Sequence, residues 1–192
     1  RNTVAAYFTP RKIAELRPLI EDYVDSQLDK IFENPNRTVE WVGEFAVPLP
    51  VIAIATILGV SPENMADFKR WSDDNISTIG SSVTDERRIS ATQGIVEMQH
   101  YFAERLEARR GNPQGDFLSD LVNTEVDNGE GGKRTLTMPE MLSIISQLLV
   151  AGNETTTNTL AEGMLYFGQD MSVWDKVRAD RSLIAPAVEE ML

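Results

Sequence analysis

The sequence predicts a mainly α-helical fold, and three observations support this. Apolar residues recur every three or four positions through several long stretches, which is the period of an amphipathic helix. Helix-start signals, a hydroxyl residue followed by proline or by glutamate three positions on, precede several of these stretches. At 192 residues and 42% hydrophobic, the chain is long enough to enclose one sizeable core, and nothing marks a domain boundary. We therefore expect a single helical domain over residues 1–192.

The first expected helix begins at Thr9-Pro10, with the threonine hydroxyl as N-cap and proline at the first helical position. It extends to a loop at residues 34–36. Its apolar residues lie at helical spacing, at Ile13, Leu16, Leu19, Ile20, Val24, Leu28 and Ile31. This pattern predicts a packed amphipathic helix.

Two proline-marked helices follow. After residues 39–46, the Pro48-Leu49-Pro50 segment breaks the chain before an apolar helix over 51–58, and Gly59 ends that helix. Ser61-Pro62-Glu63 repeats the start signal of the first helix. It predicts a helix that runs through Met65, Phe68 and Trp71.

The periodic pattern weakens at residues 76–83, where glycine and serine indicate a connection of the kind that often gates a site. A long helix is expected over about 85–110, followed by a turn at 111–113 and a short helix over 116–122.

The last third of the chain is also expected to be helical after one irregular region. Residues 127–132 predict a glycine-rich turn, and 134–136 a short extended segment. Thr137 and Glu140 have the spacing of a capping box, with Pro139 inside the first turn, and they open a long helix. Further helices are expected over about 172–178 and from 184 to the end.

Composition excludes several classes of function. The net charge of -12, with no basic face, argues against binding nucleic acid or an anionic membrane. No apolar stretch reaches the roughly 20 residues of a membrane helix, and no signal-peptide pattern is present, so cytoplasm is the expected location. The sequence has no cysteine and one histidine, His100, which lies in an amphipathic run and is expected at the surface. We expect no metal site made by this chain alone.

The long helix beginning near Thr137 carries the segment Ala151-Gly152-Asn153-Glu154-Thr155-Thr156-Thr157, directly after an apolar run. Glycine costs about 1 kcal/mol in a helix interior relative to alanine, and threonines compete for backbone hydrogen bonds. Two interpretations are open. In one, the helix is locally opened at Ala151-Gly152 and leaves room for a ligand beside the Glu154 carboxylate and the Thr155 hydroxyl. In the other, Gly152 allows close helix packing and the threonines bond to backbone carbonyls.

Helical spacing places Ile144, Gln147, Ala151 and Thr155 on one stripe, with Glu154 at its edge. The stripe changes from apolar to protic along its length. Such a face suits a pocket that holds an apolar molecule at one end and handles protons at the other.

The Ala-Gly-x-Glu-Thr-Thr pattern at 151–156 resembles the oxygen-activation signature of the cytochrome P450 family of haem-thiolate monooxygenases. Further segments resemble the bacterial soluble branch of this family, in the family's order and over nearly the whole chain. They are residues 8–11, 45–50, 58–60, 68–71, 178–180 and 187–192.

The resemblance implies roles for the central motif. Ala151 and Gly152 would lie beside the distal face of haem b, iron protoporphyrin IX. Thr155 would hydrogen-bond the iron-bound oxygen, and Glu154 would relay solvent protons to it, so these two are the candidate catalytic residues. The role of Asn153 is open, because many relatives carry histidine or another residue there.

The resemblance also implies substrate contacts at Gln147, Val150 and Ile144, although a solvent or inter-helix hydrogen bond explains Gln147 equally well. Residues 76–83 resemble the segment that roofs the substrate pocket. A hydrophobic small molecule and dioxygen are the implied substrates. Electrons would come from NAD(P)H through a ferredoxin reductase and a ferredoxin.

Two residues and a missing cysteine indicate which part of the family's catalytic domain this sequence covers. Arg1 aligns with an arginine that pairs with a haem propionate. Glu190 matches the acid of a structural Glu-x-x-Arg motif whose arginine would follow Leu192. The family's axial cysteine is missing from this sequence and is expected beyond Leu192. The chain is thus expected to be the central portion of a longer P450 catalytic domain, truncated before the cysteine-ligand loop.

Two alternatives to an oxygen-dependent monooxygenase are considered. One is a catalytically inactive helical module, used for binding or structure and derived from the same fold. The other is a peroxide-using relative, which the retained acid-threonine pair disfavours because such variants usually lose it.

Overall fold

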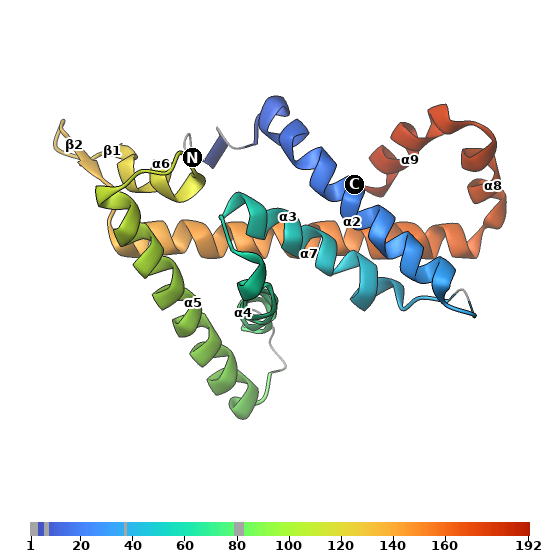
Figure 1. Ribbon diagram of the computed structural model, residues 1–192, viewed down its shortest axis with the longest axis horizontal. Helices are drawn as coiled ribbons and strands as arrows, with labels where there is room; N and C mark the ends of the chain where they lie inside the picture. Colours follow the sequence, from blue (N-terminus) through green and yellow to red (C-terminus); the bar gives the residue numbers. More distant parts are fainter. Residues whose placement is uncertain (1–3, 6–7, 37, 79–82) are drawn as a thin grey trace.

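The computed structural model describes residues 4–5, 8–36, 38–78 and 83–192, and helices dominate it (Figure 1). The helices are α2 (Pro10–Glu33), α3 (Pro48–Ile57), α4 (Met65–Ser77), α5 (Asp85–Gly111), α6 (Phe117–Asn123), α7 (Met138–Gln169), α8 (Met171–Ala179) and α9 (Ile184–Met191). The mainly α prediction is confirmed.

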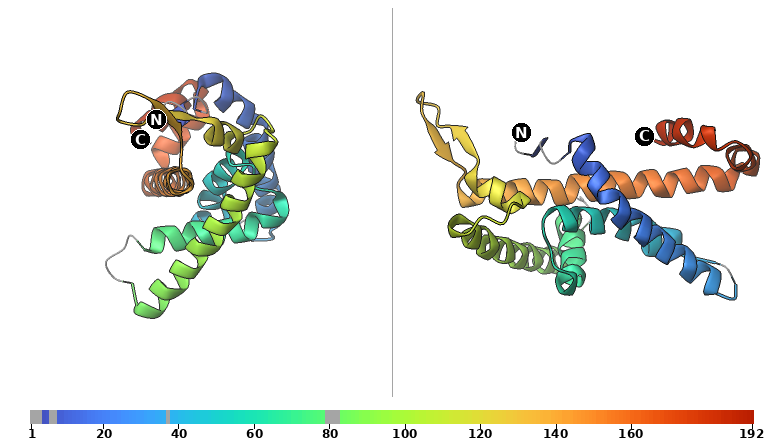
Figure 2. Two further views of the ribbon diagram at one scale, coloured as in Figure 1. Left: turned by 90° about the vertical axis from the view of Figure 1, so that its left-hand side faces the viewer. Right: turned by 45° about the horizontal axis from the view of Figure 1, so that its top comes forward.

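The 32-residue α7 runs through the length of the molecule, and the other elements are arranged around it (Figures 1 and 2). Helix α3 packs on its middle, α4 and α5 pack against its first half, and α8 and α9 fold back at its end. The predicted capping box is present, because the Thr137 N–H donates to Glu140 Oε2 at 2.8 Å. Arg134 donates to both carboxylate oxygens of Glu140, at 2.6 and 2.7 Å, and ties the preceding strand to the start of α7.

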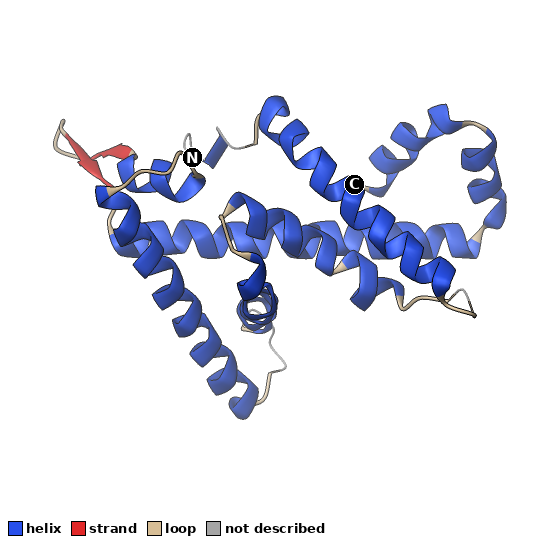
Figure 3. Ribbon diagram, viewed as in Figure 1, coloured by secondary structure: helices blue, strands red, loops and turns tan. Residues whose placement is uncertain are grey.

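Among the described residues, one antiparallel hairpin interrupts the helices (Figure 3). Its strands are β1 (Glu125–Asp127) and β2 (Lys133–Thr135), with Val126 opposite Arg134. The sequence predicted an extended segment at 134–136 but not β1. Three-residue strands carry too short an alternation to be recognised without their partner.

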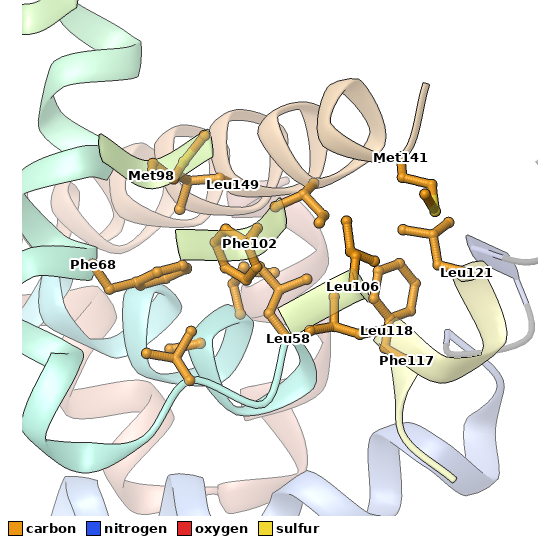
Figure 4. Close-up of a cluster of buried hydrophobic side chains, with 14 of the residues drawn as sticks. Leu58, Phe68, Met98, Phe102, Leu106, Phe117, Leu118, Leu121, Met141 and Leu149 are labelled. Atoms are coloured by element: carbon orange, nitrogen blue, oxygen red, sulfur yellow. The ribbon is translucent and has the colours of Figure 1, made fainter. Parts of the chain in front are cut away.

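The core lies between the first half of α7 and helices α3 to α6 (Figure 4). Phe68 of α4 meets Phe102 of α5 edge to face, with ring centroids 6.4 Å apart. Around this pair the fully buried side chains include Leu58, Leu106, Phe117, Leu118, Leu121, Met141, Ile145 and Leu149. Full burial of one such side chain stabilises the fold by about 1.5–3 kcal/mol.

A buried carboxylate fixes α4 against α5. The Asp74 side chain is 5% exposed and accepts a 2.6 Å hydrogen bond from Arg87. It packs where α5 has Gly94, and any side chain at Gly94 would overlap the carboxylate. The two helices therefore pack closely together, and both contact α7.

The bounds of the first helix are confirmed, but it is less fully packed than predicted. Within the described chain, α2 has no buried residue, and Ile13 and Leu28 are 45% and 40% exposed. The reason is its position. Helix α2 crosses the outside of α3, beyond the layer in which the core lies, so its apolar stripe is only partly covered.

Two helix starts differ from prediction. Helix α3 begins at Pro48, because prolines in a first turn lose no helical hydrogen bond, so Pro48-Leu49-Pro50 is part of the helix. Before α4, residues Pro62–Asn64 form the 3₁₀ turn η2, and the helix starts only at Met65. The Asn64 side-chain amide donates to Ser61 Oγ at 2.6 Å, which stabilises that turn.

Two short elements complete the chain. Residues Val42–Ala46 form a π-helical turn, η1, directly before α3, and Arg181–Leu183 form the 3₁₀ turn η3 between α8 and α9. η1 lies against α7, where the Trp41 indole N–H donates to the Leu160 carbonyl at 3.0 Å. No helix in the described ranges is long and apolar enough to cross a bilayer.

Candidate active site on the central helix

The segment Ala151–Thr157 lies inside α7, which is continuous from Met138 to Gln169. The interpretation that the helix is locally opened at Ala151-Gly152 is therefore wrong. Two threonine hydroxyls bond to carbonyls one turn earlier: Thr155 Oγ1 donates to the Ala151 oxygen at 2.9 Å, and Thr159 Oγ1, just past the segment, donates to the Thr155 oxygen at 3.0 Å. The polar side chains are thus accommodated without a break in the backbone hydrogen bonds.

Helix α7 has two distinct faces at this segment. Its buried face continues the apolar series Met141, Ile145 and Leu149 and ends in Asn153, which is 3% exposed. Ala151, Glu154 and Thr155 are all exposed. Successive helical residues are 100° apart, so the positions two before and two after Asn153 point to the opposite side. The structure thus brings the acid, the hydroxyl and the small residue together on one open face.

Gly152 faces α3. A Cβ at this position would lie 2.6 Å from Cδ1 of Ile54, a buried residue of α3. The glycine therefore lets the Ile54 side chain pack directly against the α7 backbone, and a side chain at this position would force Ile54 to move. The packing interpretation is therefore correct for Gly152. The Glu154 carboxylate and the Thr155 hydroxyl are exposed, and both can contact a ligand, as the other interpretation expected.

Asn153 joins three elements. Its Nδ2 donates to Ser72 Oγ of α4 at 2.6 Å, and its Oδ1 accepts from Thr157 Oγ1 at 3.3 Å. The Thr157 hydroxyl also lies 3.2 Å from the Ala46 carbonyl oxygen in η1. Sequence reasoning did not single out Ser72. Its signal was available, because helical spacing from Phe68 places it on the buried face of α4.

The three predicted substrate-contact residues differ in how far they are buried. Ile144 and Val150 are half-buried on α7. Gln147 is exposed, and its side-chain amide donates to Ser143 Oγ one turn back, at 3.0 Å. Of the expected roof, 76 and 77 end α4, 78 is its C-cap, and 83 lies just before α5, while 79–82 are outside the described residues.

The remaining predicted residues lie away from the motif. Glu190 is exposed on α9, where it borders a hollow with Gly163 and Tyr166 near the end of α7. Arg1 is outside the described residues. An apolar hollow of about 870 Å³ lies between α2, α8 and α9, lined by Leu28, Trp174 and Val188 among others. It contains no residue of the Ala151–Thr157 segment, and we do not assign the chemistry to it.

The residues of the motif could form one wall of a site for a planar cofactor, but they do not supply the ligand for a metal in that cofactor. Ala151 presents only a methyl group on the open face of α7, beside the two protic side chains, so a flat ring could approach the helix there. Among the described residues, no cluster of three or more potential metal ligands is present, and His100 is exposed on α5. The sequence holds no cysteine to act as a thiolate ligand.

The comparison with protein families decides the relationship. The model of the cytochrome P450 family matches residues 8–188, which is almost the whole chain. The chain belongs to the cytochrome P450 family. In this P450 chain, the continuous α7 is the helix that carries the family's Ala-Gly-x-Glu-Thr-Thr pattern.

Individual P450 relatives support the assignment over the full chain. The cytochrome P450 monooxygenase PikC of Streptomyces venezuelae is 34% identical over 192 residues, covering 100% of this chain and 44% of PikC. A steroid C26-monooxygenase of Mycobacterium tuberculosis is 32% identical, covering 100% of this chain and 50% of that enzyme. The solved structure of the P450 PksS from Bacillus subtilis superposes with a TM-score of 0.84 at 33% identity, covering 100% of this chain and 46% of PksS. The chain thus spans about half the length of the relatives it matches.

Proposed function

We propose that the chain is the central helical part of a P450 catalytic domain that activates dioxygen and hydroxylates a hydrophobic small molecule. The observation that carries this proposal is the placement of Glu154 and Thr155 together with Ala151 on the open face of a continuous α7. Membership of the P450 family supports the reaction type.

In this proposal the Thr155 hydroxyl and the Glu154 carboxylate deliver protons. A hydroxyl can pass on its own proton while it accepts another. The Thr155 proton is donated to the Ala151 carbonyl oxygen, so delivery requires the hydroxyl to rotate from that oxygen toward the open face. An exposed carboxylate one residue away can exchange protons with solvent. Together the two side chains provide a path from solvent to the face on which the oxygen chemistry takes place.

The cofactor would be haem b, which when bound supplies the redox chemistry of dioxygen activation. Ala151 and the adjoining backbone at Gly152 would form its distal wall, with Arg1 as a propionate partner. The axial thiolate would come from a segment outside these 192 residues, beyond Leu192. Glu190 would act in the structural Glu-x-x-Arg motif near the opposite side of the haem.

Substrate and electron supply complete the proposal. The half-buried Ile144 and Val150, with Gln147 nearby, favour a hydrophobic substrate that has a polar group. Electrons would come from NAD(P)H through a ferredoxin and its reductase in the cytoplasm. The electron carriers and the cytoplasmic location follow from the resemblance to bacterial soluble P450s.

The test is the absorption spectrum of the reduced, carbon-monoxide-bound form of the full-length protein containing this chain, together with its intact mass. A strongly red-shifted Soret band and a mass that extends past Leu192 are expected, because a thiolate ligand produces that band. A histidine-type band, or a protein that binds no haem, would overturn the proposal and favour the inactive helical module.

A further inference from the structure

We propose that Asn153 is a positioning residue for the proton-delivering pair. With Ser72 and Thr157 it forms a buried hydrogen-bonded brace, which fixes the rotation of α7 about its own axis and so keeps Glu154 and Thr155 on the open face. The brace is a property of the fold. Its effect on the reaction rests on the function proposed above.

The centre of the brace is buried, and both polar ends of the Asn153 side chain are hydrogen-bonded. Asn153 is 3% exposed and Ser72 is not exposed at all. The Asn153 amide nitrogen donates to Ser72, and its oxygen accepts from Thr157, so both ends of the side chain are engaged. The single Thr157 hydroxyl proton is shared between the Asn153 oxygen and the Ala46 carbonyl oxygen, at 3.3 and 3.2 Å, which connects the brace to η1.

Helix geometry links the brace to the site. Asn153 is two residues from both Ala151 and Thr155, a rotation of 200°, so a buried Asn153 places both of them on the opposite side of α7. Glu154 is 100° from Asn153 and 100° from Thr155. Rotation of α7 by a fraction of a turn would therefore move the acid and the hydroxyl off the open face.

A hydrogen-bonded brace resists such a rotation more specifically than the apolar core does. Apolar contacts are non-directional and can be exchanged for others when a helix rotates. The Asn153 amide has no such freedom, because turning it away from Ser72 would leave buried polar groups unpaired on two helices. Gly152 acts with it, since the side facing Ile54 has no room for a side chain.

A second link between the same helices provides a matched control. Asn75 of α4 accepts from Ser146 Oγ of α7 at 3.1 Å, and Asn75 is 8% exposed. Ser146 lies seven residues before Asn153, which is two helical turns from the motif. Both links pair an amide with a hydroxyl across α4 and α7, and they differ in their distance from Glu154 and Thr155. Asn75 also donates to the Trp71 carbonyl oxygen within α4 at 2.8 Å, a bond that its replacement removes as well.

The experiment compares Asn153→Ala, Ser72→Ala, the double variant and Asn75→Ala in the full-length protein. Hydrogen exchange of the backbone amides of residues 150–157 reports the brace without reference to activity. The share of consumed reductant that is released as peroxide reports the placement of the proton donors. Ser72→Ala removes only a hydroxyl group, so it supplies a folded variant even if Asn153→Ala does not fold.

We expect Asn153→Ala and Ser72→Ala each to speed exchange at residues 150–157 about tenfold, since each removes a buried hydrogen bond. Each should raise peroxide release, and the double variant should behave like either single one because the two residues act together. Asn75→Ala should speed exchange around Ser146 and leave peroxide release unchanged.

Three results would overturn the positioning role: additive effects of the two single variants, unchanged exchange at 150–157, or peroxide release that rises equally in Asn75→Ala. A Thr155→Ala variant separates this from the proposed function. If Thr155→Ala releases peroxide and the brace variants do not, the positioning role fails and the proposed function stands. If Thr155→Ala itself leaves coupling unchanged, the proton-delivery part of the proposed function fails, and faster exchange would then support a structural brace alone.

Discussion

Thr155 has a single hydroxyl group that donates to the Ala151 carbonyl oxygen at 2.9 Å on an exposed part of α7. Thr159 makes the same kind of bond one turn later, to the Thr155 carbonyl oxygen. The two residues thus share their local chemistry and differ in position relative to Ala151 and Glu154. This makes Thr159 a suitable reference for the proposed role of Thr155.

Replacing Thr155 by alanine in the full-length enzyme should separate electron consumption from product formation. We expect product to fall roughly a hundredfold, at the low end of what a positioned proton donor contributes, with peroxide released in its place. Thr159→Ala should keep its coupling. Measurement of reductant consumed, product and peroxide checks this, and normal coupling in Thr155→Ala would remove it from the proton path.

Gly152 is the other residue whose role can be tested alone. Gly152→Ala should destabilise the fold by about 1 kcal/mol, because overpacking against Ile54 costs about 1–3 kcal/mol and improved helix propensity returns about 1. Gly168, also on α7, has open space where its side chain would be, so Gly168→Ala should be neutral or stabilising.

Urea unfolding of both variants measures the difference. Adding Ile54→Ala removes both side-chain atoms that the new Cβ would meet, so Gly152→Ala should become stabilising in that background. An equal effect of Gly152→Ala with and without Ile54 would show that the glycine has another role.

Among the elements, the first turn of α7 depends most clearly on charge. The pKa of Glu140 is lowered to about 2, first by the hydrogen bonds from Arg134 and then by those from Thr137. A carboxyl whose pKa is lower in the folded state adds stability above its unfolded pKa and loses it as the pH falls through the folded value. For Glu140 that interval runs from 4.5 down to about 2.

Glu140→Gln should therefore flatten the acid limb of the stability curve. We expect the unmodified chain to lose stability progressively between pH 4.5 and about pH 2, and the variant to lose less over the same interval. Arg134→Gln should give an intermediate result, since it removes the first cause and keeps the capping box. The test is the free energy of unfolding of the three proteins measured from pH 2 to pH 7. Identical pH dependence in the unmodified chain and in Glu140→Gln would contradict the lowered pKa of Glu140.

At the scale of the whole molecule, the core is one-sided. The buried apolar residues lie between α3, α4, α5, α6 and the first half of α7, whereas α2, α8 and α9 have no buried residue within the described chain. Several large apolar side chains on that side are exposed, including Leu165, Tyr166, Ile184 and Val188. Stability should therefore be unevenly distributed along the chain.

Hydrogen exchange of the isolated 192-residue chain should show this directly. Local opening requires least free energy where few apolar contacts must break, so amides of α8 and α9 should exchange well before those of α5 and of α7 up to Leu149. Mass spectrometry of peptic fragments measures the order. Uniform protection across these helices would mean that the chain unfolds as one cooperative unit.

Much of this organisation was predictable from local sequence. The Thr9 cap, the Thr137-Glu140 capping box and the bounds of α5 were correct because the signals lie within a few residues of one another. Helical spacing also placed Ala151 and Thr155 on one face, and both are exposed in the structure. The short strand β1 was not predicted, since its partner is needed to define it.

The sequence by itself determined that the fold is mainly α, the approximate positions of the helices, and that Ala151 and Thr155 share one face of α7 with Glu154 at its edge. Only the tertiary structure decided that α7 is unbroken, that Gly152 serves the contact with Ile54, and that Asn153 is held by Ser72. The physical reason is range. Periodicity and capping act over three or four residues, whereas Asn153 and Ser72 are 81 positions apart and meet only when α4 packs across α7.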